Sequence, residues 1–143
     1  MEIAAEEARK GIRAGHGGPF GCVIVKDGEI IGRGHNEVIR LSDPTCHGEI
    51  MAIRHACKKL HSFDLSGCEL YTTAEPCPMC AGAIQWANIR KVYYGCTIFD
   101  TKEIGFRDEE FYSDSQKFSE EMDRAECLKV FEEYRAIENK THY

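Results

Sequence analysis

The chain has no apolar run that approaches the length of a membrane span, which needs about 20 consecutive apolar residues. Its opening segment, Met1–Glu7, is acidic and lacks the basic stretch followed by an apolar stretch that marks a secretion signal. These two absences argue against a membrane protein and a secreted one. They predict a cytoplasmic protein.

Repeats, low-complexity stretches and linkers are also absent, so nothing divides the 143 residues into parts. A chain of this length can bury a sizeable core without disulfides or structural metal. We therefore expect one domain over residues 1–143.

A basic surplus is lacking as well, since the formal net charge is −6. Proteins that grip nucleic acid through its phosphates usually carry a basic face, and no basic run with interleaved aromatics occurs here. The charge balance therefore disfavours a nucleic-acid partner and favours a small, free substrate.

Cysteine is plentiful, with eight residues, but a disulfide framework belongs to secreted, loop-rich chains. Only Cys77 and Cys80 have the spacing of metal ligands. The others are expected to act as small buried or surface thiols, and their roles stay open: Cys22, Cys46, Cys57, Cys68, Cys96 and Cys127.

Apolar periodicity and turn residues predict strands that alternate with helices, which is typical of a layered α/β domain. An Asp27-Gly28 turn joins the first two strands. We expect helices over 2–14, 46–60, 78–87 and from 119 to about 138, strands over 22–25, 30–32, 68–73 and 91–96, and irregular chain over 97–115.

Two short clusters carry the chemistry: His47-Gly48-Glu49 and Pro76-Cys77-Pro78-Met79-Cys80. His47, Cys77 and Cys80 are suitable ligands for Zn²⁺, and three protein ligands leave a tetrahedral ion one position for water. Closed structural sites usually have four protein ligands. The pattern H-x-E followed by P-C-x-x-C is the signature of zinc nucleobase deaminases.

Glu49 is the expected catalytic residue, because a proton shuttle needs a carboxylate beside the metal but not bonded to it. Residues at i and i+2 do not face each other inside a helix. Both can reach one metal only if His47 lies in the extended entry or in the first turn of the helix, with Glu49 reaching across the tip of the helix.

Other interpretations stay open. Cys77 and Cys80 alone could form a redox pair, although that gives His47 and Glu49 no role. A non-catalytic zinc or nucleic-acid-binding module would need a fourth protein ligand, and three thiols are candidates: Cys46, Cys68 and Cys96.

From about residue 4 to residue 138 the chain resembles the cytidine-deaminase-like superfamily, on the motifs just given. The resemblance implies a three-layer α/β/α sandwich around a five-stranded mixed sheet. It also implies zinc-dependent hydrolytic removal of an amine from a nucleobase or nucleoside.

Within that superfamily the chain looks most similar to bacterial guanine deaminases. The resemblance is carried by Gly17–Gly28, by Asn36 ahead of Asp43-Pro44-Thr45, by Gly105–Asp108 and by the terminus from Phe131 to Tyr143. It implies the conversion of guanine to xanthine and ammonia, a step of purine catabolism.

The resemblance implies that Asn36 and Asp108 orient the base, as suits a ring with both donors and acceptors. Phe20, Trp86 or Tyr143 could supply an apolar wall. Gly48, between the ligand and the acid, is counted with the substrate-binding residues. The tail over 119–143 is expected to swap between two subunits of a homodimer, where Tyr143 caps the partner's site.

Two other branches remain possible. Gly48 stands where guanine deaminases usually have Ala, and His-Gly-Glu together with Gly32–Asn36 is similar to yeast-type cytosine deaminase. His47–Arg54 and Cys80–Ala83 are similar to tRNA adenosine deaminases. Cytosine, other amino-purines, aminotriazines and tRNA adenosine therefore stay open as substrates.

Overall fold

The computed structural model describes residues 1–113 and residue 124. The chain divides into two units, 1–113 and 114–143, and the fold below is that of the first unit. The predicted helix from residue 119 and the swapped tail over 119–143 lie outside the described residues and stay predictions. None of the described helices has the length and apolar character needed to cross a membrane.

The sheet of the first unit has four strands: β1 (Gly21–Lys26), β2 (Glu29–His35), β3 (Glu69–Ala74) and β4 (Lys91–Cys96). Their order is β2-β1-β3-β4. β1 pairs antiparallel with both β2 and β3, whereas β3 and β4 are parallel. The sheet is therefore mixed, as expected. At the β1–β2 turn Asp27 and Gly28 both have positive φ, 49° and 80°, which suits a tight hairpin.

The expected fifth strand is wrong for the described chain, and so is the irregular segment after β4. Two short helices follow β4 instead, α5 (Ile98–Glu103) and α6 (Asp108–Ser113). A capping box begins α5, because the Thr97 hydroxyl accepts from the backbone of Asp100 while the Asp100 carboxylate accepts from the backbone of Thr97. This cap satisfies backbone donors that would otherwise be available to a sheet.

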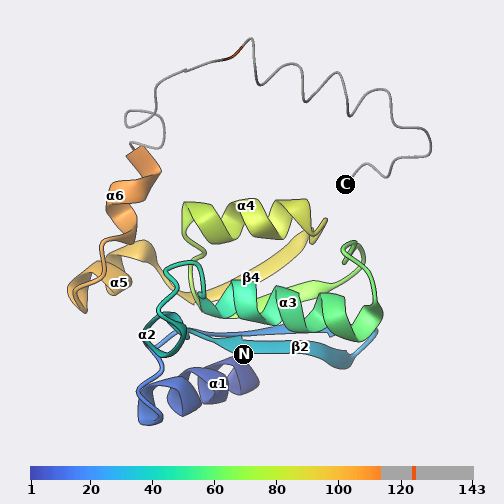
Figure 1. Cartoon of the computed structure of the whole chain (residues 1–143), viewed down its shortest axis with the longest axis horizontal. Helices are drawn as coiled ribbons and strands as arrows, with labels where there is room; N and C mark the ends of the chain where they lie inside the picture. The colour runs from blue at the N-terminus through green and yellow to red at the C-terminus, as the bar shows by residue number, and fades with distance from the viewer. Residues whose placement is uncertain (114–123, 125–143) are drawn as a thin grey trace. The chain divides into compact units, whose positions relative to one another are not determined.

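Helices cover both faces of the sheet, as Figure 1 shows. α1 (Glu2–Arg13) lies on one face, and α3 (Gly48–Leu60) and α4 (Pro78–Trp86) lie on the other. The short α2 (Val38–Leu41) follows β2. The alternating pattern predicts a layered α/β domain, and the α/β/α layering is the one that the family resemblance implies.

Glycines let the helices approach the strands closely. A Cβ on Gly21 would lie 2.1 Å from the Ala4 carbonyl oxygen of α1, and a Cβ on Gly32 would lie 2.5 Å from the Ala52 carbonyl oxygen of α3. The two helices therefore rest on backbone rather than on side chains. This close contact fixes where α3 begins, and α3 begins at the candidate site.

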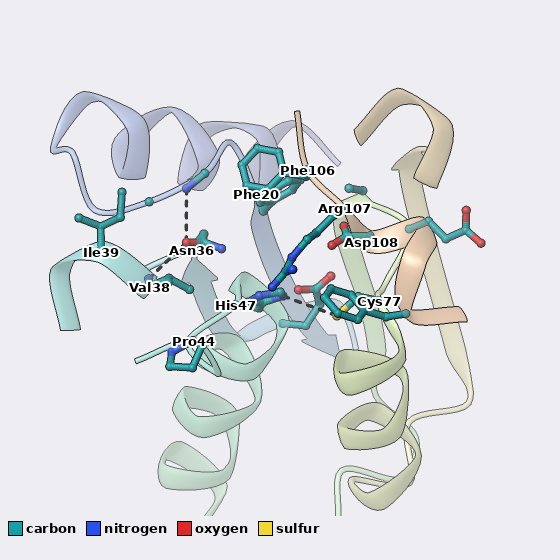
Figure 2. Close-up of a pocket in the computed structure, with 16 residues that line it drawn as sticks. Phe20, Asn36, Val38, Ile39, Pro44, His47, Cys77, Phe106, Arg107 and Asp108 are labelled. Atoms are coloured by element: carbon teal, nitrogen blue, oxygen red, sulfur yellow. Dashed lines mark hydrogen bonds between the residues drawn. The ribbon is translucent and has the colours of Figure 1, made fainter. Parts of the chain in front are cut away.

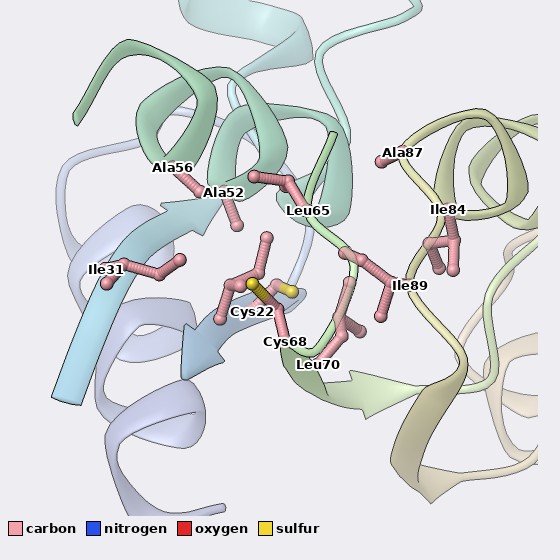
Figure 3. Packing of buried hydrophobic residues seen from close by; sticks show 11 residues of the cluster. Cys22, Ile31, Ala52, Ala56, Leu65, Cys68, Leu70, Ile84, Ala87 and Ile89 are labelled. Atoms are coloured by element: carbon pink, nitrogen blue, oxygen red, sulfur yellow. The ribbon is translucent and has the colours of Figure 1, made fainter. Parts of the chain in front are cut away.

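The core between the sheet and α3 is built from small and branched side chains (Figure 3). Small residues on α3 face branched residues on the strands and on the segments around α4. The buried cluster consists of Cys22, Ile24, Ile31, Ala52, Ala56, Leu65, Cys68, Leu70, Ile84, Ala87 and Ile89.

Replacing Gly32 with Ala should destabilise the fold by about 1–3 kcal/mol, because the new methyl group overlaps the backbone of α3. Gly82→Ala is the matched control, since Gly82 lies within α4 with no atom in the way of a Cβ. There Ala should be neutral or stabilise by up to about 1 kcal/mol. Urea unfolding measures both, and equal effects would contradict the close-approach explanation.

Candidate active site and metal centre

The ligand residues of the candidate metal site lie where two helices begin. His47 is the residue before α3, with extended backbone angles (φ −72°, ψ 161°), and Cys77 has the same place before α4 (φ −63°, ψ 166°). Cys80 lies in the first turn of α4, whose first residue is Pro78. His47 thus has the extended entry, one of the two positions that the spacing allowed.

The three ligand atoms converge. All lie within 4.8 Å of one another, and the Cys77 sulfur is 3.6 Å from Nδ1 of His47. Zn–S and Zn–N bonds of about 2.3 and 2.05 Å at a tetrahedral angle put the two atoms about 3.6 Å apart. This donor set therefore fits zinc. Among the described residues no fourth Cys, His or acid joins the group, which disfavours a closed structural site.

The two thiols, Cys77 and Cys80, differ in pKa. A hydrogen bond from Cys80 and one from His47 lower the pKa of Cys77 to about 4 against the opposing effect of burial. The bond to Cys77 and burial raise the pKa of Cys80. The pKa of His47 is raised because its ring bonds to the Cys77 sulfur. Cys77 is thus the more acidic of the two thiols, and a cation that binds to all three ligand atoms displaces the protons they carry.

Glu49 lies beside this cluster without belonging to it. Its side chain is in the first turn of α3 and the residue is only 5% exposed. The Thr72 hydroxyl on β3 donates to Oε1 of Glu49 over 3.0 Å. Burial raises the pKa of Glu49 although the bond from Thr72 opposes it. A buried, held carboxylate with increased basicity is what a proton carrier requires.

A cavity of about 480 Å³ opens above the metal ligands (Figure 2). Polar groups and aromatic rings from the loop before β1, from α3, from the turn before α4 and from the segment before α6 share its walls. Its lining includes Gly17, Gly18, Phe20, Asn36, Val38, Ile39, Pro44, His47, Glu49, Ala74, Glu75, Cys77, Phe106, Arg107, Asp108 and Phe111.

Asn36 is 4% exposed and is held by its own neighbours. Its Oδ1 accepts from the backbone N–H groups of Gly18, at 3.3 Å, and Val38, at 3.2 Å. The side-chain oxygen is thereby committed to the protein. The amide NH₂ is left as the group that can donate to a bound molecule.

The remaining walls are aromatic and charged. Phe20 and Phe106 meet edge to face with ring centroids 4.8 Å apart. The Arg107 guanidinium lies 5.2 Å from the centroid of the Phe111 ring. Burial, and then the nearby Cys77 sulfur, raise the pKa of Asp108. Asp108 is therefore close enough to the metal ligands to feel their charge.

Two predicted substrate-binding residues lie elsewhere. Trp86 is the last residue of α4, is 66% exposed and does not line the cavity, because its position is two turns beyond Cys80. Gly48 is not in the lining either; it packs under the Phe20 carbonyl, where a Cβ would be 3.1 Å from the oxygen. Tyr143 lies outside the described residues.

Sequence reasoning missed several residues of the site, four of which bear on its chemistry. Phe106, Arg107 and Phe111 line the cavity, and Thr72 holds Glu49. Phe106 and Arg107 belong to the segment singled out for Asp108, so a signal existed for them. No sequence signal marks Thr72, since a Thr that holds a catalytic acid looks the same in the sequence as a Thr that only packs in a strand.

The site combines one imidazole and two thiols as metal ligands with a separate buried acid in the first turn of α3. This combination defines the class of zinc-dependent deaminases. The profile of the cytidine and deoxycytidylate deaminase zinc-binding region matches residues 1–96. The chain belongs to this family, and it is a zinc-dependent deaminase.

Individual relatives of this chain include deaminases that act on different substrates. The chain is 46% identical to guanine deaminase of Bacillus subtilis, over 100% of this chain and 96% of that protein. An X-ray structure of guanine deaminase from the same organism superposes with a TM-score of 0.94 at 44% identity, covering 99% of this chain and 95% of that one. A tRNA-specific adenosine deaminase from Aquifex aeolicus is also 46% identical, but over 66% of this chain and 62% of that protein.

Replacing Cys77 with Ala should abolish tight zinc binding. Loss of a group behind a metal ligand costs about 10–100-fold in affinity, and loss of the ligand itself should cost more. Cys96→Ala is the matched control, because Cys96 is exposed on β4 and outside the cluster. Elemental analysis after dialysis checks both variants. If Cys77→Ala retained one equivalent of tightly bound zinc, the assignment of Cys77 as a ligand would be contradicted.

Proposed function

We propose that this protein hydrolyses the exocyclic amine of guanine, giving xanthine and ammonia. The observation that carries the proposal is the similarity to a guanine deaminase along the whole chain. The shared zinc motif alone would fit several substrates. The similarity to tRNA adenosine deaminase, by contrast, covers two thirds of the chain.

The proposed catalytic group is Glu49. A zinc ion held by His47, Cys77 and Cys80 supplies Lewis-acid activation of water at neutral pH. Because Thr72 engages Oε1 of Glu49, we assign proton transfer to Oε2. This oxygen takes the proton of the attacking water and passes it to the ring nitrogen beside the attacked carbon. Glu49 then carries the proton of the hydroxyl group added to the carbon to the amine, the carbonyl forms as the C–N bond breaks, and ammonia leaves.

Recognition of the base is assigned to Asn36 and Asp108. The Asn36 NH₂ can donate to a ring carbonyl or ring nitrogen, and the Asp108 carboxylate can accept from ring or amine N–H groups. Guanine presents both kinds of edge. Phe20 and Phe106 give the cavity an apolar side suited to a planar ring.

Two features support a free base over a polynucleotide. The formal net charge is −6, and strong phosphate binding needs a basic face. The cavity volume, about 480 Å³, lies within the range of small-molecule sites.

Ammonia release from guanine, guanosine, cytosine, adenine, ammeline and tRNA tests the proposal. We expect turnover of guanine far above the others. In Glu49→Gln, which keeps the shape of the side chain, we expect retained zinc and fold with turnover reduced by at least about 10²–10⁴-fold.

The outcomes test the substrate and the mechanism separately. Activity on cytosine or tRNA with none on guanine would contradict the substrate but not the reaction. Full activity in Glu49→Gln would contradict the mechanism itself.

A further inference from the structure

A second cluster of metal-ligating side chains lies outside the candidate active site. It joins His16, after α1, His35, at the end of β2, and Glu37, before α2. Their ligand atoms all lie within 4.8 Å of one another. Nδ1 of His16 is 2.9 Å from Nε2 of His35, and that Nε2 is 3.5 Å from Oε1 of Glu37.

The backbone holds all three residues in place. The His16 carbonyl accepts from the N–H groups of Ile39 and Arg40, at 3.0 and 3.1 Å, and the His16 N–H donates to the Gly11 carbonyl at 2.9 Å. The Glu37 N–H donates to the Cys46 carbonyl at 2.9 Å. The cluster therefore joins three segments whose relative positions are already set.

Gly11 makes room for the His35 ring. A Cβ on Gly11 would lie 2.8 Å from Cδ2 of His35, so the imidazole occupies the space of a missing side chain. Glycine inside a helix costs about 0.5–1 kcal/mol relative to alanine. The helix bears that cost at the one place where the ring of His35 passes.

A buried acid lies behind the cluster. Oε2 of Glu7 is 3.7 Å from Nδ1 of His35, on the side of the ring away from His16. Glu7 is 7% exposed. Burial would raise its pKa, but the bond from Lys10 and the charge of Arg33 outweigh burial and lower it. An ionised Glu7 favours the tautomer of His35 with its proton on Nδ1, so that Nε2 accepts from Nδ1 of His16. An ion bound between the two rings would take the place of the proton on Nδ1 of His16.

We propose that His16, His35 and Glu37 form a second site, which binds one divalent transition-metal ion of the kind that imidazole and carboxylate prefer, such as Zn²⁺. The ligand atoms are Nδ1 of His16, Nε2 of His35 and Oε1 of Glu37. Two nitrogens on one tetrahedral zinc are about 3.3 Å apart. The two ring nitrogens lie 2.9 Å apart, so the rings need to separate by a few tenths of an ångström to hold the ion. A carboxylate behind a ligand histidine is a recurrent arrangement at metal sites.

The charges around this second site set its strength. Glu37 pairs with Arg40 through its other oxygen, Oε2, and Glu7 pairs with Lys10 and Arg33. Three cations thus offset two acids, so the second site should bind more weakly than the thiolate centre. The alternative is a plain hydrogen bond between His16 and His35, which would need no ion.

Titration of the zinc-loaded full chain with further Zn²⁺ distinguishes a second metal site from a plain hydrogen bond between His16 and His35. We expect wild type to bind one additional equivalent by isothermal titration calorimetry, with a rise in thermal midpoint at excess Zn²⁺. His16→Gln and Glu37→Gln should lose both effects while keeping the first equivalent. Glu7→Gln should keep the stoichiometry and weaken the second equivalent by about 10–100-fold.

Two controls complete the design. His61→Asn removes an exposed histidine outside the cluster and should behave as wild type. Cys77→Ala should lose the first equivalent and keep the second. If wild type binds no additional equivalent, or if His16→Gln binds it as tightly as wild type, the second site does not exist.

Discussion

The structure depends on the meeting of two helix N-termini at one point. α3 and α4 each begin with a residue in extended backbone, His47 and Cys77, and these two side chains approach to 3.6 Å. Helix N-termini favour negative charge, which suits the thiolate of Cys77 and opposes in part the effect of burial on the carboxylate of Glu49. Every other part of the proposed site is arranged around this junction.

The sheet fixes the junction by close backbone contact. Gly32 and Gly34 of β2 bring α3 down onto the strand, and Gly21 does the same for α1 on the other face. Because these contacts are backbone to backbone, α3 cannot shift without a clash. β3 supplies Thr72 beneath the junction, so the acid is held by the sheet while the metal ligands are held by the helices.

Much of the fold and the centre of the site could be predicted from the sequence. The spacing within each pair, His47 with Glu49 and Cys77 with Cys80, is local, and local spacing determines which side chains share the start of one helix. Other features could not be predicted, for separate reasons. Trp86 was one of three aromatic candidates for an apolar wall, and residue type alone does not say whether its side chain reaches the cavity. α5 has a Thr97-x-x-Asp100 signature that predicts a helix start and was overlooked. The His16, His35 and Glu37 cluster depends on tertiary contacts between separate segments, and no sequence spacing reveals it.

The central claim is a metal held by two thiolates and one imidazole with no fourth protein ligand. X-ray absorption at the zinc edge, on protein loaded with one equivalent of zinc, tests it most directly. The account predicts two sulfur neighbours at about 2.3 Å and nitrogen or oxygen neighbours at about 2.0–2.1 Å. Three or four sulfur neighbours would contradict it, because the position proposed for water would then be closed.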